Sequence, residues 1–287
     1  MKVITEITRV SQPSVKEFMN EFVYPKRPVI ITGGLDMWKA KDWDLQILKE
    51  KIGKKEFSFR SEEGTKTAIF SEMIDQITNS NPLSPAPYLR NMDLLKMFPE
   101  LRDDVFPNIS YMKNNWRDHW MWPKNWPEHV GQDLIELFIS AKGVAFPKLH
   151  IDYWGMDGFI AQLHGSKEFI LYSPEDSAYL YPSIDNPLVS TVTDFINPDF
   201  HKFPELAKAT QYRFELKAGD LLYNPRWWHT TKTLETSITI IMAYWHRENY
   251  PVFLDEIKRA YKDCNKIKTY TKVNYFKGLG LMLAKSR

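Results

Sequence analysis

The hydrophobic positions of this chain predict mostly short β-strands, concentrated between residues 146 and 246. Apolar and β-branched residues dominate two runs, 159–164 and 167–172, which only Gly165 and Ser166 separate. A glycine-containing pair between two such runs is typical of a β-hairpin. Further strands are expected on both sides of the Gly219-Asp220 turn and at 236–245. The pattern therefore indicates a mainly β fold in this part of the chain.

The first 145 residues combine strands with short amphipathic helices. Ser14 and Glu17 form a capping-box pattern before Phe18, and Asp44 precedes a second helical run that Gly53 ends. Strands are expected at 3–10, 29–32 and 57–60, and further helical segments at 71–77 and 94–98. We interpret these elements as a scaffold (1–145) around a β-rich core (146–246), within one domain of residues 1–250.

Two long segments show little periodicity. Residues 114–126 contain four tryptophans, and we interpret them as an irregular lining near the opening of the β-rich core, with a lid as the alternative. Residues 181–210 exceed the length of a simple connection within a compact domain, which suggests a functional role.

The C-terminal segment, residues 251–287, is expected to form a helix, a turn and a second helix or tail. It carries nine Lys or Arg and three acids, a net charge of about +6, whereas the rest of the chain carries about −4. The simplest interpretation is a solvated basic extension that packs on the core, with a possible homodimer contact. Binding of tRNA or of an acidic peptide is the alternative.

Composition narrows the class of protein. With 287 residues, 43% of them hydrophobic, the chain is long enough for one core. Its single cysteine, Cys264, excludes an internal disulfide and favours a reducing compartment. No apolar run approaches the roughly 18 residues that a membrane helix needs, and the first residues lack the apolar region of a signal peptide. We therefore expect a cytoplasmic protein without membrane contact.

The candidate chemistry begins with His150 and Asp152, one residue apart in an apolar, β-favouring context. On a strand, residues i and i+2 point to the same face, so imidazole and carboxylate would project side by side. His229, which follows two tryptophans, could supply a third ligand from a distant strand. Two histidines and one carboxylate leave open positions on a metal and are typical of non-haem Fe(II) oxygenases. A lone histidine is also common as an ordinary buried residue, so the first pair alone does not decide the matter.

Lys167 stands at the start of a strand, on the same face as Phe169 and Leu171. A lysine in that position either extends its charge to the rim of the β-core or pairs with a buried anion. The remaining histidines are not expected to be ligands: His119, His129, His164, His201 and His246, the last at the rim after the final strand.

In this order, the motifs resemble the jumonji-C, cupin-like family of Fe(II)- and 2-oxoglutarate-dependent oxygenases. The similarity rests on the His-x-Asp pair, the glycine turn before Lys167, the Gly219-Asp220 turn, the Trp-Trp-His229 segment and the final tryptophan strand. It extends to residues 27–34 and Trp38. The chain is most similar to the small-hydroxylase branch that includes the asparaginyl hydroxylase acting on hypoxia-inducible factor, and residues 195–204 resemble a segment of that enzyme. The spacing from the first histidine to the lysine is closer to that of the jumonji lysyl hydroxylases.

The resemblance implies a double-stranded β-helix, a jelly-roll or cupin-like barrel, with helices packed outside. The site residues that it implies are His150, Asp152 and His229 for Fe(II), Lys167 and Tyr88 for the distal carboxylate of 2-oxoglutarate, and Trp154 and Trp245 for the substrate. For Tyr88, an ordinary aromatic residue of a strand is an equally good interpretation. O2 would be the second cosubstrate. Because both histidines must be neutral to bind a metal, activity is expected to fall in acid.

The implied activity is hydroxylation of a C–H bond, with a protein or peptide side chain as the favoured substrate. Alternatives are hydroxylation of a tRNA base or a free amino acid, removal of methyl groups from lysine, and a cupin-like module that binds peptide or RNA without catalysis. A metal-dependent cupin of isomerase or dioxygenase type commonly uses three histidines and one glutamate, and the sequence shows no such set.

Three positions depart from the family pattern. Pro147 stands where members often have threonine or serine, three residues before the first histidine. Ala243 replaces an asparagine of the last strand, and Gly158 or Ile160 replaces another after the acid. These changes leave the metal ligands and the lysine in place, so we expect them to affect how 2-oxoglutarate is oriented and which substrate fits.

Overall fold

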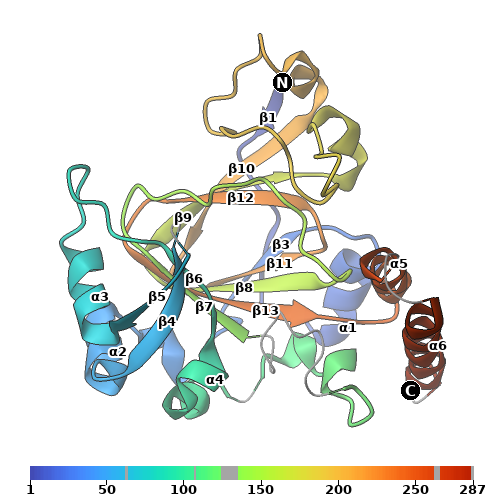
Figure 1. Ribbon diagram of the computed structural model, residues 1–287, viewed down its shortest axis with the longest axis horizontal. Helices are drawn as coiled ribbons and strands as arrows, with labels where there is room; N and C mark the ends of the chain where they lie inside the picture. Colours follow the sequence, from blue (N-terminus) through green and yellow to red (C-terminus); the bar gives the residue numbers. More distant parts are fainter. Residues whose placement is uncertain (62–63, 107, 124–134, 262–265, 286–287) are drawn as a thin grey trace.

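Two facing β-sheets form the centre of the computed structural model, which describes residues 1–61, 64–106, 108–123, 135–261 and 266–285 (Figure 1). Together the sheets make a jelly-roll, double-stranded β-helix barrel with helices outside it. The expected mainly β, cupin-like fold is therefore confirmed. Trp126, His129 and Cys264 lie outside the described residues.

The smaller sheet has the strand order β1, β10, β9, β12. These strands span Lys2–Ile4, Thr210–Lys217, Ser166–Tyr172 and Trp228–Thr233. The larger sheet has the order β2, β3, β11, β8, β13, β7, β6. Its strands span Arg9–Ser11, Val29–Thr32, Asp220–Asn224, Asp157–His164, Ser237–Tyr244, Ile135–Ser140 and Leu89–Asp93. Strands from residues 1–145 therefore pair directly with strands of the barrel core.

Apolar residues of both sheets fill the barrel interior. Phe169 and Leu171 of β9 meet Ile160 of β8 and Leu222 of β11. Because side chains alternate along a strand, Lys167 points to the same inner face as Phe169. A charged group thus enters an apolar interior.

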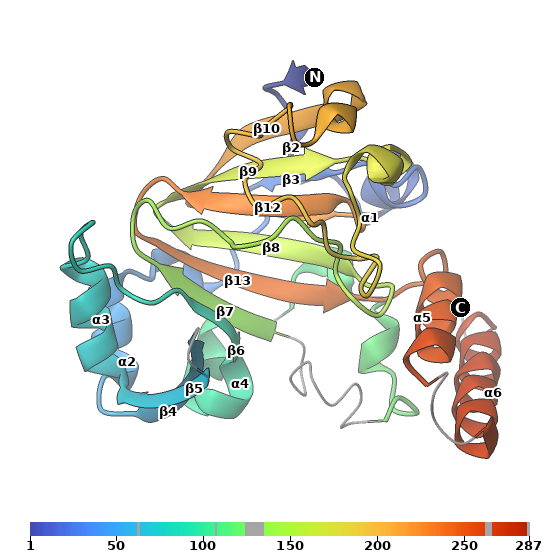
Figure 2. The same ribbon diagram turned by 45° about the horizontal axis from the view of Figure 1, so that its top comes forward.

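Helices and a hairpin cover the other face of the larger sheet. They are α1 (Val15–Phe18) with a π-helical turn (Met19–Val23), α2 (Leu45–Ile52), α3 (Phe70–Thr78), α4 (Leu94–Met97), and the hairpin of β4 (Glu56–Ser61) and β5 (Gly64–Ile69). Their apolar residues form the main core with Phe159, Leu221 and Ile240 of the sheet. Figure 2 shows α2 and α3 at one end of the strands and α5 at the other.

Capping side chains mark the starts of α1 and α2, as predicted. The Ser14 hydroxyl accepts from the Glu17 N–H, and the Glu17 carboxylate accepts from the Ser14 N–H, which completes the capping box. The Asp44 carboxylate accepts from the Ile47 N–H at 2.7 Å at the start of α2.

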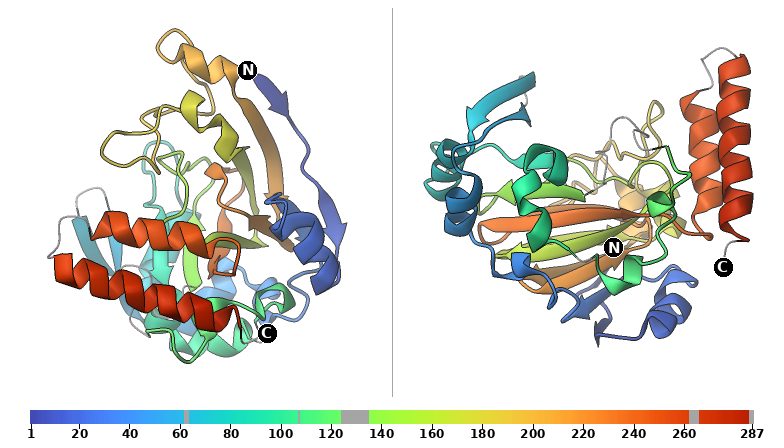
Figure 3. Two further views of the ribbon diagram at one scale, coloured as in Figure 1. Left: turned by 90° about the vertical axis from the view of Figure 1, so that its right-hand side faces the viewer. Right: turned by 90° about the horizontal axis from the view of Figure 1, so that it is seen from below.

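The C-terminal segment forms two helices that lie side by side, α5 (Tyr250–Ala260) and α6 (Lys266–Leu283) (Figure 3). They pack Phe253 and Phe276 against Trp245, which follows β13. Exposed apolar residues remain on α6: Ile267, Tyr270, Leu281 and Met282. The homodimer contact remains a prediction. Among the described residues, no helix is both long enough and apolar enough to cross a bilayer.

Two predictions of local structure were wrong, and one strand was not predicted. The strand expected at 3–10 is two strands that join different sheets, since β1 pairs with β10 and β2 pairs with β3. Strand β7 was not predicted. Nearly all of its residues are buried, so the sequence lacks the alternation of apolar and polar residues by which a half-buried strand is recognised. His246 is buried, not at the rim, because its Nε2 lies 2.7 Å from an oxygen of Asp157 that also accepts from the Tyr223 hydroxyl.

Candidate metal centre

Backbone pairing brings the two predicted histidine ligands together. The His150 N–H donates to the His229 carbonyl at 3.1 Å, and the His229 N–H donates to the His150 carbonyl at 2.8 Å. On the other edge, the Ser190 N–H donates to the Leu149 carbonyl at 3.0 Å, so the long segment 181–210 supports the same stretch. In this stretch only His150 forms β-bridges, with His229 and with Val189, and Asp152 lies just before the turn at Trp154 and Gly155. The expected strand through His150 and Asp152 is therefore reduced to the two bridges at His150.

The three predicted ligand side chains converge on one point. The two imidazole centroids are 4.3 Å apart. Asp152 Oδ1 lies 3.7 Å from His150 Nε2 and 3.8 Å from His229 Nε2. Within the part of the chain that the structure describes, this is the one group of three metal-binding side chains, with ligand atoms within 4.8 Å of one another. Ligands held about 2.1 Å from one ion are about 3 to 4 Å apart, so the spacing suits a shared ion.

Hydrogen bonds orient both imidazoles. His150 Nδ1 lies 3.3 Å from the Lys148 carbonyl, and His229 Nδ1 lies 3.1 Å from the Trp227 carbonyl. A carbonyl oxygen can only accept, so Nδ1 carries the hydrogen wherever it bonds to the carbonyl, and Nε2 then keeps its lone pair. At His229 the Asn224 amide nitrogen, 3.2 Å from Nδ1, competes with the Trp227 carbonyl for the same ring atom. Both Nε2 atoms are then able to bind a metal.

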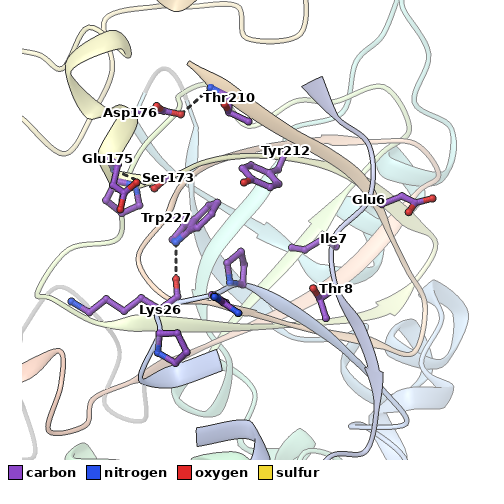
Figure 4. Close-up of a pocket in the computed structure, with 14 residues that line it drawn as sticks. Glu6, Ile7, Thr8, Lys26, Ser173, Glu175, Asp176, Thr210, Tyr212 and Trp227 are labelled. Carbon is purple, nitrogen blue, oxygen red and sulfur yellow. Dashed lines mark hydrogen bonds between the residues drawn. The ribbon is translucent and has the colours of Figure 1, made fainter. Parts of the chain in front are cut away.

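Asn224, which sequence analysis missed, holds the residue that orients His229. Its side chain accepts from the Trp227 N–H at 3.1 Å and donates to the Trp227 carbonyl at 3.2 Å. Figure 4 shows the indole of Trp227 donating to the Lys26 carbonyl, at 3.0 Å, beside Tyr212. Lys26, Tyr212 and Trp227 border a cleft of about 630 Å³ that none of the predicted site residues lines. Trp227 thus fixes the backbone before His229 through contacts that lie outside the ligand cluster.

His150 is held in its neutral form. Burial and the nearby His229 lower the pKa of His150 to about 4 from 6.5, although Asp152 acts in the opposite direction. The ring of Phe146 stacks on the imidazole at 4.8 Å, and the Arg90 guanidinium lies 5.5 Å from the Phe146 ring. We therefore expect protonation to remove His150 as a metal ligand only at a pH well below neutral.

In the metal-free protein, we expect the His150 ring to titrate with a pKa near 4. This pKa is below the value of 6.5 in the unfolded chain, so between pH 4 and pH 6.5 the unfolded state binds more protons than the folded state. Stability that is fully present above pH 6.5 is therefore lost as the pH falls towards 4, by up to about 3 kcal/mol. An NMR titration and denaturant unfolding in chelator would measure both effects, and His150→Gln should lack this loss. A ring pKa at its ordinary value would contradict the prediction.

Lys167 is buried and faces Tyr88, its predicted partner in cosubstrate binding. Only 2% of Lys167 is exposed, and its Nζ lies 3.1 Å from the Tyr88 hydroxyl. No carboxylate among the described residues forms an ion pair with it. The interpretation of a lysine reaching the barrel rim is therefore wrong. A buried ammonium is costly without an anion, which favours the second interpretation, a bound anion.

The two tryptophans expected to contact a substrate support the protein interior. Trp245 is fully buried, stacks on Trp122 and donates its indole N–H to the Trp154 carbonyl at 2.8 Å. Trp154 is half-buried in the same aromatic cluster. The structure does not place Trp245 where a substrate can contact it, because the side chain has no accessible surface.

Two of the three departures from the family pattern lie next to Asp152. A Cβ built on Gly158 would lie 3.4 Å from Asp152 Oδ2, and Ala243 pairs directly with Gly158 across β8 and β13. Ile160, the other candidate, belongs to the apolar barrel interior. Two small residues therefore stand beside the carboxylate where family members often have amides.

A family model described as a cupin-like domain matches residues 15–251. The chain belongs to the cupin-like domain family. The cofactors expected above, Fe(II), 2-oxoglutarate and O2, are those of the jumonji-C oxygenases within this cupin-like group.

Curated relatives of this cupin-like chain include jumonji-C proteins. Lysine-specific demethylase 8 of Danio rerio is 28% identical over 253 residues, which cover 84% of this chain and 58% of the relative. JmjC domain-containing protein D of Dictyostelium discoideum is 28% identical over 260 residues, 83% of this chain and 56% of the relative. Human tRNA wybutosine-synthesizing protein 5 is 26% identical over 272 residues, 84% of this chain and 78% of the relative. The chain thus spans little more than half the length of the first two relatives. These similarities do not specifically support the asparaginyl hydroxylase branch.

Proposed function

We propose that this cupin-like chain is an Fe(II)- and 2-oxoglutarate-dependent oxygenase that hydroxylates a C–H bond. The observation that supports it most is the cluster of His150, Asp152 and His229 in the same barrel as a buried Lys167. Two neutral imidazoles and one carboxylate suit Fe(II) and leave coordination positions open. When bound, Fe(II) with 2-oxoglutarate and O2 supplies the oxidising power for the reaction.

The residues of the chain bind and orient the reactants. His150, Asp152 and His229 would hold the metal. The Lys167 ammonium and the Tyr88 hydroxyl, 3.1 Å apart, would both donate to one carboxylate of 2-oxoglutarate. The apolar barrel interior excludes water around Lys167, which strengthens a charge-assisted hydrogen bond.

A protein or peptide side chain is the favoured substrate. A cleft of about 840 Å³ is lined by Tyr88, Arg90 and Pro147, while Lys167 and the three metal-ligand candidates are not part of its lining. Its apolar lining includes Phe59, Met73, Pro85, Ala86, Pro87 and Val144. A concave, mainly apolar surface with a few polar groups suits a side chain that must be oriented for reaction. The relative named as a lysine-specific demethylase agrees with a protein substrate.

The test is oxidation of proteins from a cell extract by the purified chain with Fe(II), 2-oxoglutarate and O2. We expect succinate release and one added oxygen atom on a peptide, detected by mass spectrometry, with neither product in the absence of 2-oxoglutarate. A protein that binds metal and 2-oxoglutarate but releases no succinate with any extract would instead be a binding module.

A tRNA substrate is the second candidate. The similarity to human tRNA wybutosine-synthesizing protein 5 covers 78% of that relative, more than for the two other relatives described. The basic residues Lys272 and Lys277 lie on α6. An RNA fraction offered in the same assay would distinguish the candidates, because only a tRNA hydroxylase adds oxygen to a nucleoside. Its activity should also fall steeply with salt.

A further inference from the structure

Glu256 on α5 contacts both segments that carry the metal-ligand candidates. Its Oε2 accepts the N–H of Trp154, two residues after Asp152. Its Oε1 accepts from Nη2 of Arg226 at 2.5 Å, three residues before His229. Glu256 is only 6% exposed, so both bonds form in an interior where charge-assisted hydrogen bonds are strong.

These segments need support because both contain left-handed backbone. Trp154 has φ +60°, Gly155 has φ +63° and Arg226 has φ +57°. Residues other than glycine rarely adopt such angles and keep them only where the surroundings hold them. Trp154 is held at both backbone groups, since Glu256 accepts its N–H and the Trp245 indole donates to its carbonyl.

The turn after Asp152 also packs directly on α5. A Cβ at Gly155 would lie 2.5 Å from the Phe253 nitrogen, so only glycine permits this approach. Arg226 depends on the same helix, because Glu256 is its ion-pair partner and its Nε is buried without a hydrogen-bond partner among the described residues. This helix is therefore part of the support of the ligand cluster.

We propose that Glu256 is a positioning residue of the metal centre. One buried carboxylate fixes the backbone beside Asp152 and beside His229, and so sets the relative position of two ligands whose atoms lie 3.8 Å apart. The inference rests on the proposed function, because it assumes that these side chains bind a metal.

The experiment measures Co(II) binding, as a stable probe for Fe(II), to the full chain and to Glu256→Ala, Glu256→Gln and Asp255→Asn. Glu256→Ala should weaken Co(II) binding about 10- to 100-fold and change the visible absorption spectrum of the bound ion. Glu256→Gln should weaken it less, because an amide oxygen still accepts the Trp154 N–H. Asp255→Asn is the matched control, since this exposed carboxylate on the same helix pairs only with Lys258 at 2.6 Å among the described ion pairs.

Circular dichroism and thermal unfolding would accompany the binding measurement. If Glu256 only anchors α5, its variants lower the melting temperature and bind Co(II) like the unaltered chain, which would overturn the inference alone. If Glu256→Ala does not fold, unchanged affinity and spectrum in Glu256→Gln and in Arg226→Met would overturn it. Absence of Co(II) binding by the unaltered chain would overturn the proposed function together with the inference.

Discussion

Asp152→Ala should abolish succinate release and weaken binding of Fe(II), or of Mn(II) as a substitute, by at least about 100-fold. The substitution removes the one carboxylate of the cluster and leaves two imidazoles with centroids 4.3 Å apart. A divalent ion then loses both a ligand and its countercharge. Calorimetry under anaerobic conditions would measure the affinity, and a succinate assay the turnover.

The control for this variant is Asp42→Ala, which removes an exposed carboxylate from a short helical turn, Lys39–Asp42, and should change neither quantity. Among the described residues the Asp152 carboxylate makes no hydrogen bond and lies 3.7 and 3.8 Å from Nε2 of His150 and His229, so its loss should leave the fold of the metal-free protein intact. An Asp152→Ala protein that is folded and binds metal as tightly as the unaltered chain would disprove the ligand assignment.

Lys167→Met should raise the concentration of 2-oxoglutarate required for activity by about 30-fold or more. Truncating one partner of a buried, hydrogen-bonded charge pair costs about 2 to 5 kcal/mol, and the lower value corresponds to that factor. Metal binding should persist, because Lys167 is not one of the clustered ligands. Tyr88→Phe removes one hydrogen bond from an uncharged hydroxyl to the carboxylate, worth about 1.5 kcal/mol, and should raise the requirement only about tenfold.

The thermal stability of Lys167→Met is a second measurement, and we expect it to change in the opposite direction to the affinity for 2-oxoglutarate. Without cosubstrate, the Lys167 ammonium is buried with no carboxylate partner among the described residues, so Lys167→Met should leave the melting temperature unchanged or raise it. Addition of 2-oxoglutarate should then stabilise the unaltered protein but not the variant. An unchanged dependence on 2-oxoglutarate in Lys167→Met would refute the role of this lysine.

Short-range features of the sequence were enough to predict much of the barrel and the ligand candidates. Ser14 and Asp44 cap their helices because a capping hydrogen bond spans only three residues. Gly165, with φ +62°, turns β8 into β9 because the turn needs a left-handed residue that carries no Cβ. His150 and Asp152 were recognisable because residues this close in the chain share one environment.

The lysine lay at the limit of sequence reasoning. The alternation along its strand predicted the face on which Lys167 lies, but it left open whether the ammonium reached water or an anion. The structure showed that the ammonium does not reach water, since Lys167 is buried beside Tyr88, a residue 79 positions away. Burial depends on the elements that close over a side chain, and no local pattern contains them.

By itself, then, the sequence determined the strand pattern, the helix starts and the identity of the ligand candidates, all of which depend on neighbours along the chain. Only the tertiary structure decided which sheet each N-terminal strand joins and that Trp245 is a buried support. It alone showed that Glu256, 102 residues from Trp154, holds the turn beside Asp152. Such contacts form between segments that the topology of the barrel brings together, so neither residue alone carries a signal of its partner.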